Sequence, residues 1–427
     1  MKDPLNILIV AQNASTRFGG EAIIPIHYFR EIKRLGHNVM MVTHERNRSD
    51  ILDYFQGSSD GIFFTKDTIF HRFLWIMGRF FPKRVGELFF GTILNLFDEF
   101  FQNRIIAEIV KARPIEVIHQ PIPVSPNAPS SIFGFGIPVV IGPLNGGMSY
   151  PEGWENLETR IERWTLVASR AIAPILNRLV PGKAKAAILL VANERTHKAL
   201  PIKHRDVRVL VENGVDYETF GQLANVDQSP AGSIRLVYMG RLVAWKAVNV
   251  TLEAVCMVRR QGVDVRFDIV GDGPERGQLE RLTDALDLAE VVNFHGFKPQ
   301  AECADILRKS DALILNSVYE CGGAVVLEAM AIGLPTIVTN WGGPMDYVDR
   351  STGILVDPVP RSTFDRRLAE AIMQLASDPT VRTALGQAGA ERTFQYYNWE
   401  EKGKQMINIY GCAISSTKQR SAQSVLT

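Results

Sequence analysis

Two glutamates and a glycine pair are the residues of this sequence best suited to binding chemistry. Glu320 and Glu328 flank Gly322-Gly323, and residues 324–332 are otherwise apolar. This pattern predicts a short buried helix that Gly333 ends. A carboxylate in such a helix costs free energy unless hydrogen-bond donors meet it, and the glycines leave backbone N–H groups open at the positive helix end. The segment therefore offers amides for a phosphate and an acceptor for hydroxyl groups, and a nucleotide sugar supplies both.

Two cations five residues apart lie upstream of the glutamates. Arg241 lies two residues after the apolar run 234–239, and Lys246 follows five residues later. Two cations at a strand end can clamp a diphosphate and neutralise the charge of a departing nucleoside diphosphate. The alternative is an ordinary surface pair. Because no D-x-D pair is present to hold a divalent metal, we expect no metal or other cofactor and assign the metal's task to these cations.

The elements that must position these residues form two similar halves. Strand-like runs alternate with helical patterns, which predicts parallel sheets covered by helices; the runs are 7–10, 39–43, 117–119, 138–141 and 187–192, then 234–239, 265–270, 291–295, 312–316, 336–339 and 353–356. We expect an α/β fold with two Rossmann-like domains, 1–209 and 210–397, that face a cleft. The last segment, 398–427, is expected to be a helix that packs back on the first domain.

Composition indicates an ordinary globular protein. Of the 427 residues, 46% are hydrophobic and 22% charged, and the net charge of +1 predicts no nucleic-acid partner. The four scattered cysteines suit a reducing cytoplasm and argue against a disulfide framework or a zinc site. No uncharged apolar run reaches the ~20 residues of a spanning helix, and the start of the chain does not read as a signal peptide.

Two segments of the first half are basic, aromatic and free of acids. They are residues 68–86 and 163–193, which include Arg72, Arg79, Lys83 and Arg84 in the first and Arg163, Arg170, Arg178, Lys183 and Lys185 in the second. Such segments can lie on an anionic membrane face. They can equally be helices packed on the first sheet with solvated arginines, and the sequence leaves both readings open.

Residues 319–335 resemble the E-x7-E signature of retaining glycosyltransferases of family 4, the group 1 glycosyltransferases, which have the GT-B fold. Further matching pieces follow the family's order: 213–216, 240–243 with Lys246, 271–274, 295–297 and 342–344. The resemblance covers about 210–400 strongly and the first half weakly, through Gly19-Gly20 and His119. The chain departs from the pattern at Cys321, where phenylalanine is frequent, and at Ala247, where glycine is frequent and alanine looks tolerable.

The resemblance implies a role for each residue. Glu328 would accept the ribose hydroxyls and Glu320 would meet the transferred sugar, whereas a plain structural reading makes Glu328 a carboxylate favoured by the helix dipole. His119 would contact the sugar or assist proton transfer, although a lone histidine is more often a satisfied core residue. The catalytic set is Glu320, Arg241, Lys246 and His119, and the donor-binding set is Glu328, Gly322, Gly323, Ala324, Val325, Gly19, Gly20, His295, Gly296 and Phe297.

Together these features predict a retaining glycosyltransferase of the hexosyltransferase type. The expected donor is a UDP- or GDP-sugar, and the expected acceptor is a glycan or a lipid-linked sugar in polysaccharide or exopolysaccharide assembly. We expect a cytoplasmic protein, with peripheral contact to the inner membrane face if the basic segments bind lipid. The alternatives are a GT-B epimerase or hydrolase and a non-catalytic subunit that binds nucleotide sugars. An NAD dehydrogenase is disfavoured because neither half begins with G-x-G-x-x-G.

Overall fold

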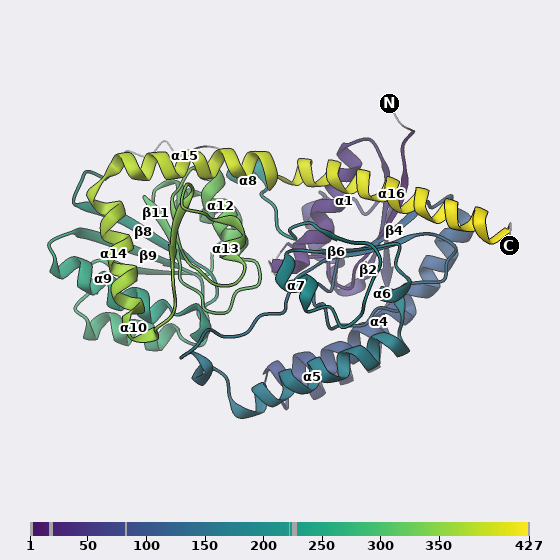
Figure 1. The fold of residues 1–427 in the computed structure, drawn as a ribbon, viewed down its shortest axis with the longest axis horizontal. Coiled ribbons are helices and arrows are strands. Elements are labelled where there is room, and N and C mark those ends of the chain that lie inside the picture. Colours follow the sequence, from purple (N-terminus) through teal and green to yellow (C-terminus); the bar gives the residue numbers. More distant parts are fainter. Residues whose placement is uncertain (1–2, 17–19, 82, 222, 224–228, 426–427) are drawn as a thin grey trace. The chain divides into compact units, whose positions relative to one another are not determined.

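The computed structural model describes residues 3–425 except 17–19, 82, 222 and 224–228. The chain forms two compact units (Figure 1). The first unit consists of Met1–Gly147, Glu158–Glu212 and Trp399–Thr427, and the second consists of Met148–Leu157 and Asn213–Asn398. Each unit is built on one parallel sheet, as the repeated alternation of strand and helix patterns predicts.

Within the described residues, the sheet of the first unit has seven strands in the order β3-β2-β1-β4-β5-β6-β7, and all neighbours run parallel. The strands are β1 (Asn6–Val10), β2 (Asn38–His44), β3 (Ile62–Thr65), β4 (Val117–Gln120), β5 (Val139–Leu144), β6 (Ile188–Val191) and β7 (Val207–Val209). The helices are α1 (Ile24–Arg34), α2 (Arg48–Tyr54), α3 (Ile69–Gly78), α4 (Lys83–Ala112), α5 (Arg160–Leu179), α6 (Gly182–Lys185), α7 (Glu194–Lys198) and α16 (Trp399–Val425). The order of strands reverses between β1 and β4.

The core of the first unit follows the two-residue period of a strand. Ile7 and Ile9 of β1 point to one face of the sheet, where α1 and α16 pack. Leu8 and Val10 point to the other face, where α4 packs. Helix α16 is tied to α1 by a stacked pair, His27 on Trp399, with ring centroids 4.6 Å apart.

The second unit repeats this architecture. Within the described residues its sheet has six parallel strands in the order β10-β9-β8-β11-β12-β13, which reverses between β8 and β11. The strands are β8 (Ser233–Met239), β9 (Asp264–Val270), β10 (Val292–Gly296), β11 (Ala312–Leu315), β12 (Thr336–Thr339) and β13 (Gly353–Val356). The helices are α8 (Tyr217–Phe220), α9 (Val248–Arg260), α10 (Arg276–Ala285), α11 (Gln300–Arg308), α12 (Ala324–Ile332), α13 (Pro344–Tyr347), α14 (Phe364–Ser377) and α15 (Pro379–Tyr396).

The predicted α/β class with two Rossmann-like sheets is confirmed. Most expected strands lie within one or two residues of the observed ones, and helix α12 ends at Gly333, whose φ of 88° is the left-handed cap that glycine favours. The sequence did not predict β3 and β7, which are the two edge strands of the first sheet. The segment Met148–Leu157 belongs to the second unit, although it precedes most of that unit by about 60 residues in sequence.

Candidate active site

The predicted donor-site residues gather at one edge of the second sheet. Arg241 and Lys246 follow β8, Glu320 follows β11, and His295 lies at the end of β10. Because the strands are parallel, their carboxyl ends share one edge, and β8 and β11 are the strands between which the order reverses. Ligands of open α/β sheets bind at such a switch point.

Lys246 and Glu320 meet across this switch point. The Lys246 ammonium forms an ion pair with the Glu320 carboxylate, and both side chains are largely buried, with 15% and 17% exposed. Arg241 lies nearby in sequence but is exposed, and no ion pair to it is found among the described residues. The structure therefore joins one predicted cation to one predicted glutamate and leaves the other cation open to solvent.

The loops that carry this pair are bonded to each other. The Val318 N–H donates to the Trp245 carbonyl (2.9 Å), and the Asn316 side chain donates to the Ala247 carbonyl (2.7 Å). Ala247 has φ 51° and ψ 34°, so it adopts the left-handed conformation that costs an alanine roughly 1–2 kcal/mol. The departure from glycine at this position looked tolerable in the sequence, but it holds the loop in a strained conformation.

Gly322 and Gly323 end a loop that opens directly into α12. Gly323 is the N-cap with φ 82°, a conformation that glycine adopts without strain, and no side chain caps the helix there. The Gly343 N–H donates to the Glu320 carbonyl (2.7 Å), which fixes the backbone just before the glycines. Ala324 and Val325 form the first helical residues. The N–H groups of this first turn form the positive end of the helix dipole, as the sequence predicts.

Glu328 lies in the second turn of α12, half-buried among apolar neighbours. Burial, and to a smaller extent the nearby charge of Asp216, raise the pKa of its carboxyl to about 7. No hydrogen bond or ion pair to Glu328 is found within the described part of the chain. Its position beyond the first turn weakens the reading as a carboxylate held only by the helix dipole. A carboxyl without a protein partner is suited to accept hydroxyl groups from a ligand.

The third part of the predicted donor site lies at the end of β10. The His295 ring contacts Asp268 on β9, with Nε2 and Oδ1 2.6 Å apart, so the ring is directed to a neighbouring strand. The Gly296 carbonyl accepts from the Gly271 N–H (2.8 Å), and Phe297 is 74% exposed. The Gly271–Gly273 motif is explained by packing, because a Cβ on Gly271 would lie 1.9 Å from the Gly240 carbonyl oxygen.

The sequence missed a strap formed by residues 148–150. The Tyr150 ring packs on Tyr319 with centroids 4.8 Å apart, directly before Glu320. The Trp341 indole N–H donates to the Ser149 carbonyl (2.9 Å), and Met148 lies beside Gly342. The only local signals are the two aromatic residues Tyr150 and Trp154, which do not specify a partner.

In the first unit, the predicted site residues are not brought together in the same way. Gly19 lies outside the described residues, and Gly20 is exposed with φ 57° at the start of a short 3-10 helix. His119 is fully buried, and its Nε2–H donates to the Gly142 carbonyl (2.8 Å) while Nδ1 accepts from the Tyr410 hydroxyl (2.7 Å). Burial lowers the pKa of His119 to about 4. With both nitrogens bonded inside the core, the structure favours the satisfied core histidine over a ring that contacts substrate.

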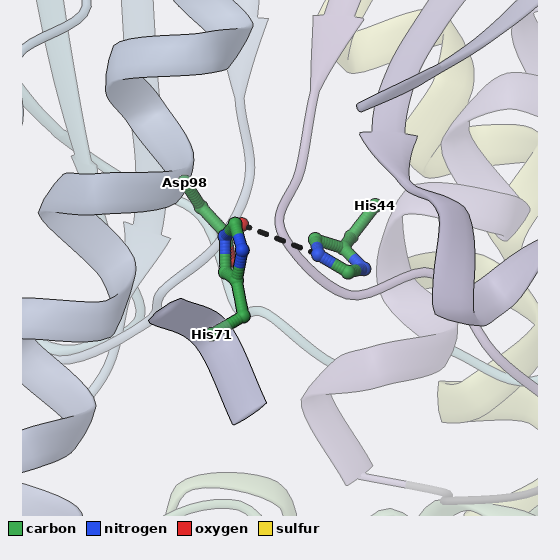
Figure 2. A group of neighbouring side chains, drawn as sticks. All are labelled: His44, His71 and Asp98. Atoms are coloured by element: carbon green, nitrogen blue, oxygen red, sulfur yellow. Dashed lines mark hydrogen bonds and ion pairs between the residues drawn. The ribbon is translucent and has the colours of Figure 1, made fainter. Parts of the chain in front are cut away.

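The first unit also contains a buried polar cluster that the sequence analysis did not single out. Figure 2 shows His44 and His71 directed toward Asp98, with their ligand atoms within 4.8 Å of one another. Backbone N–H groups of Arg46 and Thr68 donate to the two Nδ1 atoms, so both Nε2 atoms keep their hydrogens. A metal ligand must offer a lone pair, which neither Nε2 has in this arrangement. The cluster therefore fits an internal polar network, in which His71 Nε2–H donates to Asp98 (2.7 Å). His44 Nε2 lies 3.6 Å from Asp98 Oδ1 and has no hydrogen-bond partner among the described residues.

Comparison with known proteins agrees with the geometry of the second unit. Residues 222–392 match the sequence model of the family described as glycosyl transferases group 1. The predicted resemblance is thereby confirmed over these residues. The chain is 31% identical over 176 residues to an alpha-D-kanosaminyltransferase of Streptomyces kanamyceticus, covering 41% of this chain and 45% of that protein. It is 37% identical over 165 residues to the lipopolysaccharide core biosynthesis glycosyltransferase LpsD of Rhizobium meliloti, covering 38% and 45%. The chain thus matches less than half the length of these relatives.

Solved structures resemble the whole chain. A sucrose-phosphate synthase from Thermosynechococcus elongatus superposes with a TM-score of 0.64 at 18% identity, covering 96% of this chain and 100% of that one. Alr3699/HepE of Anabaena, solved in complex with UDP, gives a TM-score of 0.65 at 16% identity, covering 95% and 100%. At such identity the likeness shows the fold alone, and the predicted GT-B fold is confirmed.

Proposed function

We propose that this protein is a retaining glycosyltransferase that takes its sugar from a nucleoside diphosphate sugar. The observation that supports this most directly is the group formed by Lys246, Glu320, Arg241 and the uncapped start of α12 at one sheet edge. The match of residues 222–392 to group 1 glycosyltransferases supports the same chemistry. In this proposal Arg241 and Lys246 bind the diphosphate, and Glu328 accepts the ribose hydroxyls.

The donor in the proposal is a UDP- or GDP-sugar, and the transferred group is a hexose. Glu320 contacts the sugar while its pairing with Lys246 holds it next to the diphosphate. The bond from the anomeric carbon to the phosphate oxygen breaks, the acceptor oxygen bonds to the same face of that carbon, and the acceptor proton passes to the leaving phosphate. This route needs no covalent nucleophile from the protein. Its need for charge neutralisation is met by the two cations without a metal ion.

The proposed acceptor is a glycan or a lipid-linked sugar in polysaccharide assembly. The similarity to a protein of lipopolysaccharide core biosynthesis supports this class. A lipid-linked acceptor lies at a membrane surface, so the proposal includes peripheral contact on the cytoplasmic side through residues 68–86 and 163–193.

A thermal-shift screen of nucleoside diphosphates and their sugars tests the donor part of the proposal. A true donor at 100 times its Kd should stabilise the protein by ~2.7 kcal/mol. The hits are then incubated with and without candidate acceptors, in the presence and absence of a chelator. Transfer that survives chelation supports the proposal. Rapid release of free sugar or of an epimer from donor alone would assign the protein to the hydrolases or epimerases. Donor binding without turnover, unchanged by Glu320→Ala, would make it a binding subunit.

A further inference from the structure

The exposed apolar surface of this protein is concentrated on three helices of the first unit. Of the 22 large apolar side chains that are exposed among the described residues, 16 lie between Ile69 and Phe100 or between Ile161 and Leu179. These ranges cover α3, α5 and the part of α4 up to Phe100. Single exposed apolar residues are normal on a soluble protein, but a contiguous set of this size marks an interaction surface. We call the surface formed by residues 69–100 and 161–179 the α3–α5 face.

Helix α5 turns its apolar side outward. Ile161, Trp164, Ile172, Ile175 and Leu179 are all exposed, and their spacing of three, four or seven to eight residues places them on one stripe. The buried residues of α5, Ala173 and Asn177, lie on the opposite side. A surface helix normally directs its apolar stripe to the core, so this orientation is reversed.

Helix α3 is held in a similar orientation by the polar cluster beneath it. Its buried residues are His71 and Leu74, and His71 bonds to Asp98 of α4. Phe73 and Trp75, by contrast, are more than half exposed. Because the buried hydrogen bond fixes which side of α3 faces inward, the aromatic side is presented to the surroundings (Figure 2 shows the anchoring residues).

The gap between α4 and α5 is an apolar groove. It has a volume of about 460 Å³ and is lined by Phe81, Phe89, Phe90, Trp164, Thr165 and Ala168. Helices α4 and α5 contact each other (Figure 1). Five of its six lining residues are apolar, so the groove suits a hydrocarbon chain.

Most of the charges next to the exposed apolar residues are positive, although Asp67 pairs with Arg72 and Glu162 lies on α5. Arg72, Arg79, Arg163, Arg170 and Arg178 are exposed, and residues 68–86 and 163–193 contain no acid. The Arg79 guanidinium lies over the Trp75 ring, 4.9 Å from its centroid, so the C-terminal end of α3 presents an aromatic ring and a positive charge together.

One cation of these segments, Lys183, does not contribute to the surface charge that the sequence predicts. Lys183 is buried, donates to the Ser125 and Pro126 carbonyls, and has its pKa lowered to about 7 by burial. The Lys183 ammonium is therefore a structural group of the first unit. The Lys185 ammonium is 4.4 Å from the centroid of the Phe133 ring, which lies outside α3, α4 and α5.

We propose that the α3–α5 face docks on an anionic lipid bilayer, with its aromatic side chains at the headgroup boundary and its arginines on lipid phosphates. Charge complementarity selects this occupant. If a second copy covered the face about a twofold axis, a surface with an excess of arginine would meet itself. No helix in the described part of the chain is long and apolar enough to cross a bilayer. This inference rests on the proposed function in one respect, because the proposed lipid-linked acceptor is the reason for the protein to contact a membrane.

Flotation of the full chain with vesicles tests this, because it requires neither donor nor acceptor. The protein should float with phosphatidylglycerol vesicles at low salt, be released by high salt, and stay unbound with phosphatidylcholine. The triple variant Arg79→Gln, Arg170→Gln, Arg178→Gln should bind on the order of 100-fold more weakly, about fivefold per arginine. The matched triple variant Lys111→Gln, Lys203→Gln, Arg205→Gln removes three exposed cations of the same unit outside the face and should bind like the unchanged chain.

The apolar contribution is tested by Trp75→Ser with Trp164→Ser, which should abolish flotation, whereas Phe394→Ser, at an exposed position of the second unit, should not. Circular dichroism verifies that each variant is folded. Wild-type binding by both the arginine and the tryptophan variants would overturn the proposal, as would equal binding to both lipids. Light scattering that shows a dimer dissociated by Trp164→Ser, without flotation, would assign the face to a second copy. Because transfer is not measured here, a failure of flotation leaves the proposed activity to its own test.

Discussion

The polar residues at the carboxyl edges of the two sheets differ in how many hydrogen bonds and ion pairs they form within the protein. At the edge of the second sheet, Arg241 is exposed and Glu328 has no hydrogen bond or ion pair among the described residues, while Lys246 has only Glu320. At the edge of the first sheet, His119 uses both ring nitrogens inside the protein, and Asp98 accepts from His71 and Gln12.

The difference separates polar groups that hold the fold together from polar groups that are available to a ligand. A buried group with all its hydrogen bonds made stabilises one conformation and gains little by changing partners. A half-buried carboxyl or a cation at a sheet edge gains from a ligand that supplies the missing partner. In our proposal the edge of the second sheet therefore binds the ligand, whereas His119 and Asp98 at the edge of the first sheet have a structural role.

The largest effect is expected at the ion pair across the switch point. If the second edge binds the diphosphate, Lys246→Ala should lower kcat/KM for transfer about 10²–10³-fold, because a positioned donor of this kind contributes that much. Steady-state kinetics with the identified donor provide the measurement. The matched control is Lys298→Ala, which removes an ammonium from the exposed pair with Glu302 and should change kcat/KM less than about twofold. Similar losses in the two variants would remove the distinction between the edges.

Glu328→Gln should weaken donor binding and at the same time stabilise the free protein. The raised pKa of Glu328 means that the folded chain holds its proton more tightly than the unfolded chain between pH 4.5 and about 7, so the charged form destabilises the fold above that range. At pH 8 the free energy of unfolding of the variant should be about 1–3 kcal/mol higher than that of the unchanged chain. This gain should disappear near pH 4.5. Donor affinity should fall on the order of 10-fold, since hydrogen bonds to a charged acceptor are lost.

Urea unfolding at the two pH values and donor titration measure both effects. Glu302→Gln, on the exposed side of α11, serves as the control and should show neither. A variant that binds donor like the unchanged chain would leave Glu328 as a structural residue.

At the first edge, the same kind of change should act on stability alone. Tyr410→Phe leaves His119 Nδ1 unpaired in the core and should lower the free energy of unfolding by about 1–3 kcal/mol. Transfer by the folded variant at low temperature should remain within about twofold. Tyr396→Phe, at an exposed position, is the control for the loss of a hydroxyl. A drop in kcat without a loss of stability would return His119 to the list of catalytic candidates.

The smallest effect is expected at Ala247. Because its φ is positive, Ala247→Gly should relieve strain and raise the free energy of unfolding by about 0.5–1 kcal/mol. Ala254→Gly, in the middle of α9 with ordinary helical geometry, should instead destabilise by about 1 kcal/mol or more. If Ala247→Gly also changes donor affinity, the strained loop contributes to the position of Lys246.

Much of the second unit could be predicted from local patterns. The runs that became β8 and β9 are short, contain several β-branched residues and are followed by glycine, and the run that became β12 follows Pro335. Gly323 and Gly333 mark the two ends of α12. These features depend on neighbours in sequence, so periodicity and cap residues were enough to find them.

The strap at Met148–Tyr150 and the setting of His119 could not be predicted in this way. Both depend on partners far away in the chain, Tyr319 for Tyr150 and Tyr410 for His119. A histidine at the end of a strand reads the same in the sequence whether its nitrogens face solvent or a tyrosine hydroxyl. The same is true of His44, His71 and Asp98, which are spread over more than 50 residues.

The sequence by itself determined the two α/β halves, the glycine-rich start of α12 and the candidates Arg241, Lys246, Glu320 and Glu328, since each is written in residue types at short spacing. Only the tertiary structure decided which of these groups are bonded within the protein and which are open. It paired Lys246 with Glu320, surrounded His119 and Lys183 with partners, and turned the apolar side of α5 outward. The physical reason is that burial and hydrogen-bond satisfaction are properties of contacts between distant segments, and those contacts set which charges and apolar surfaces remain available for binding.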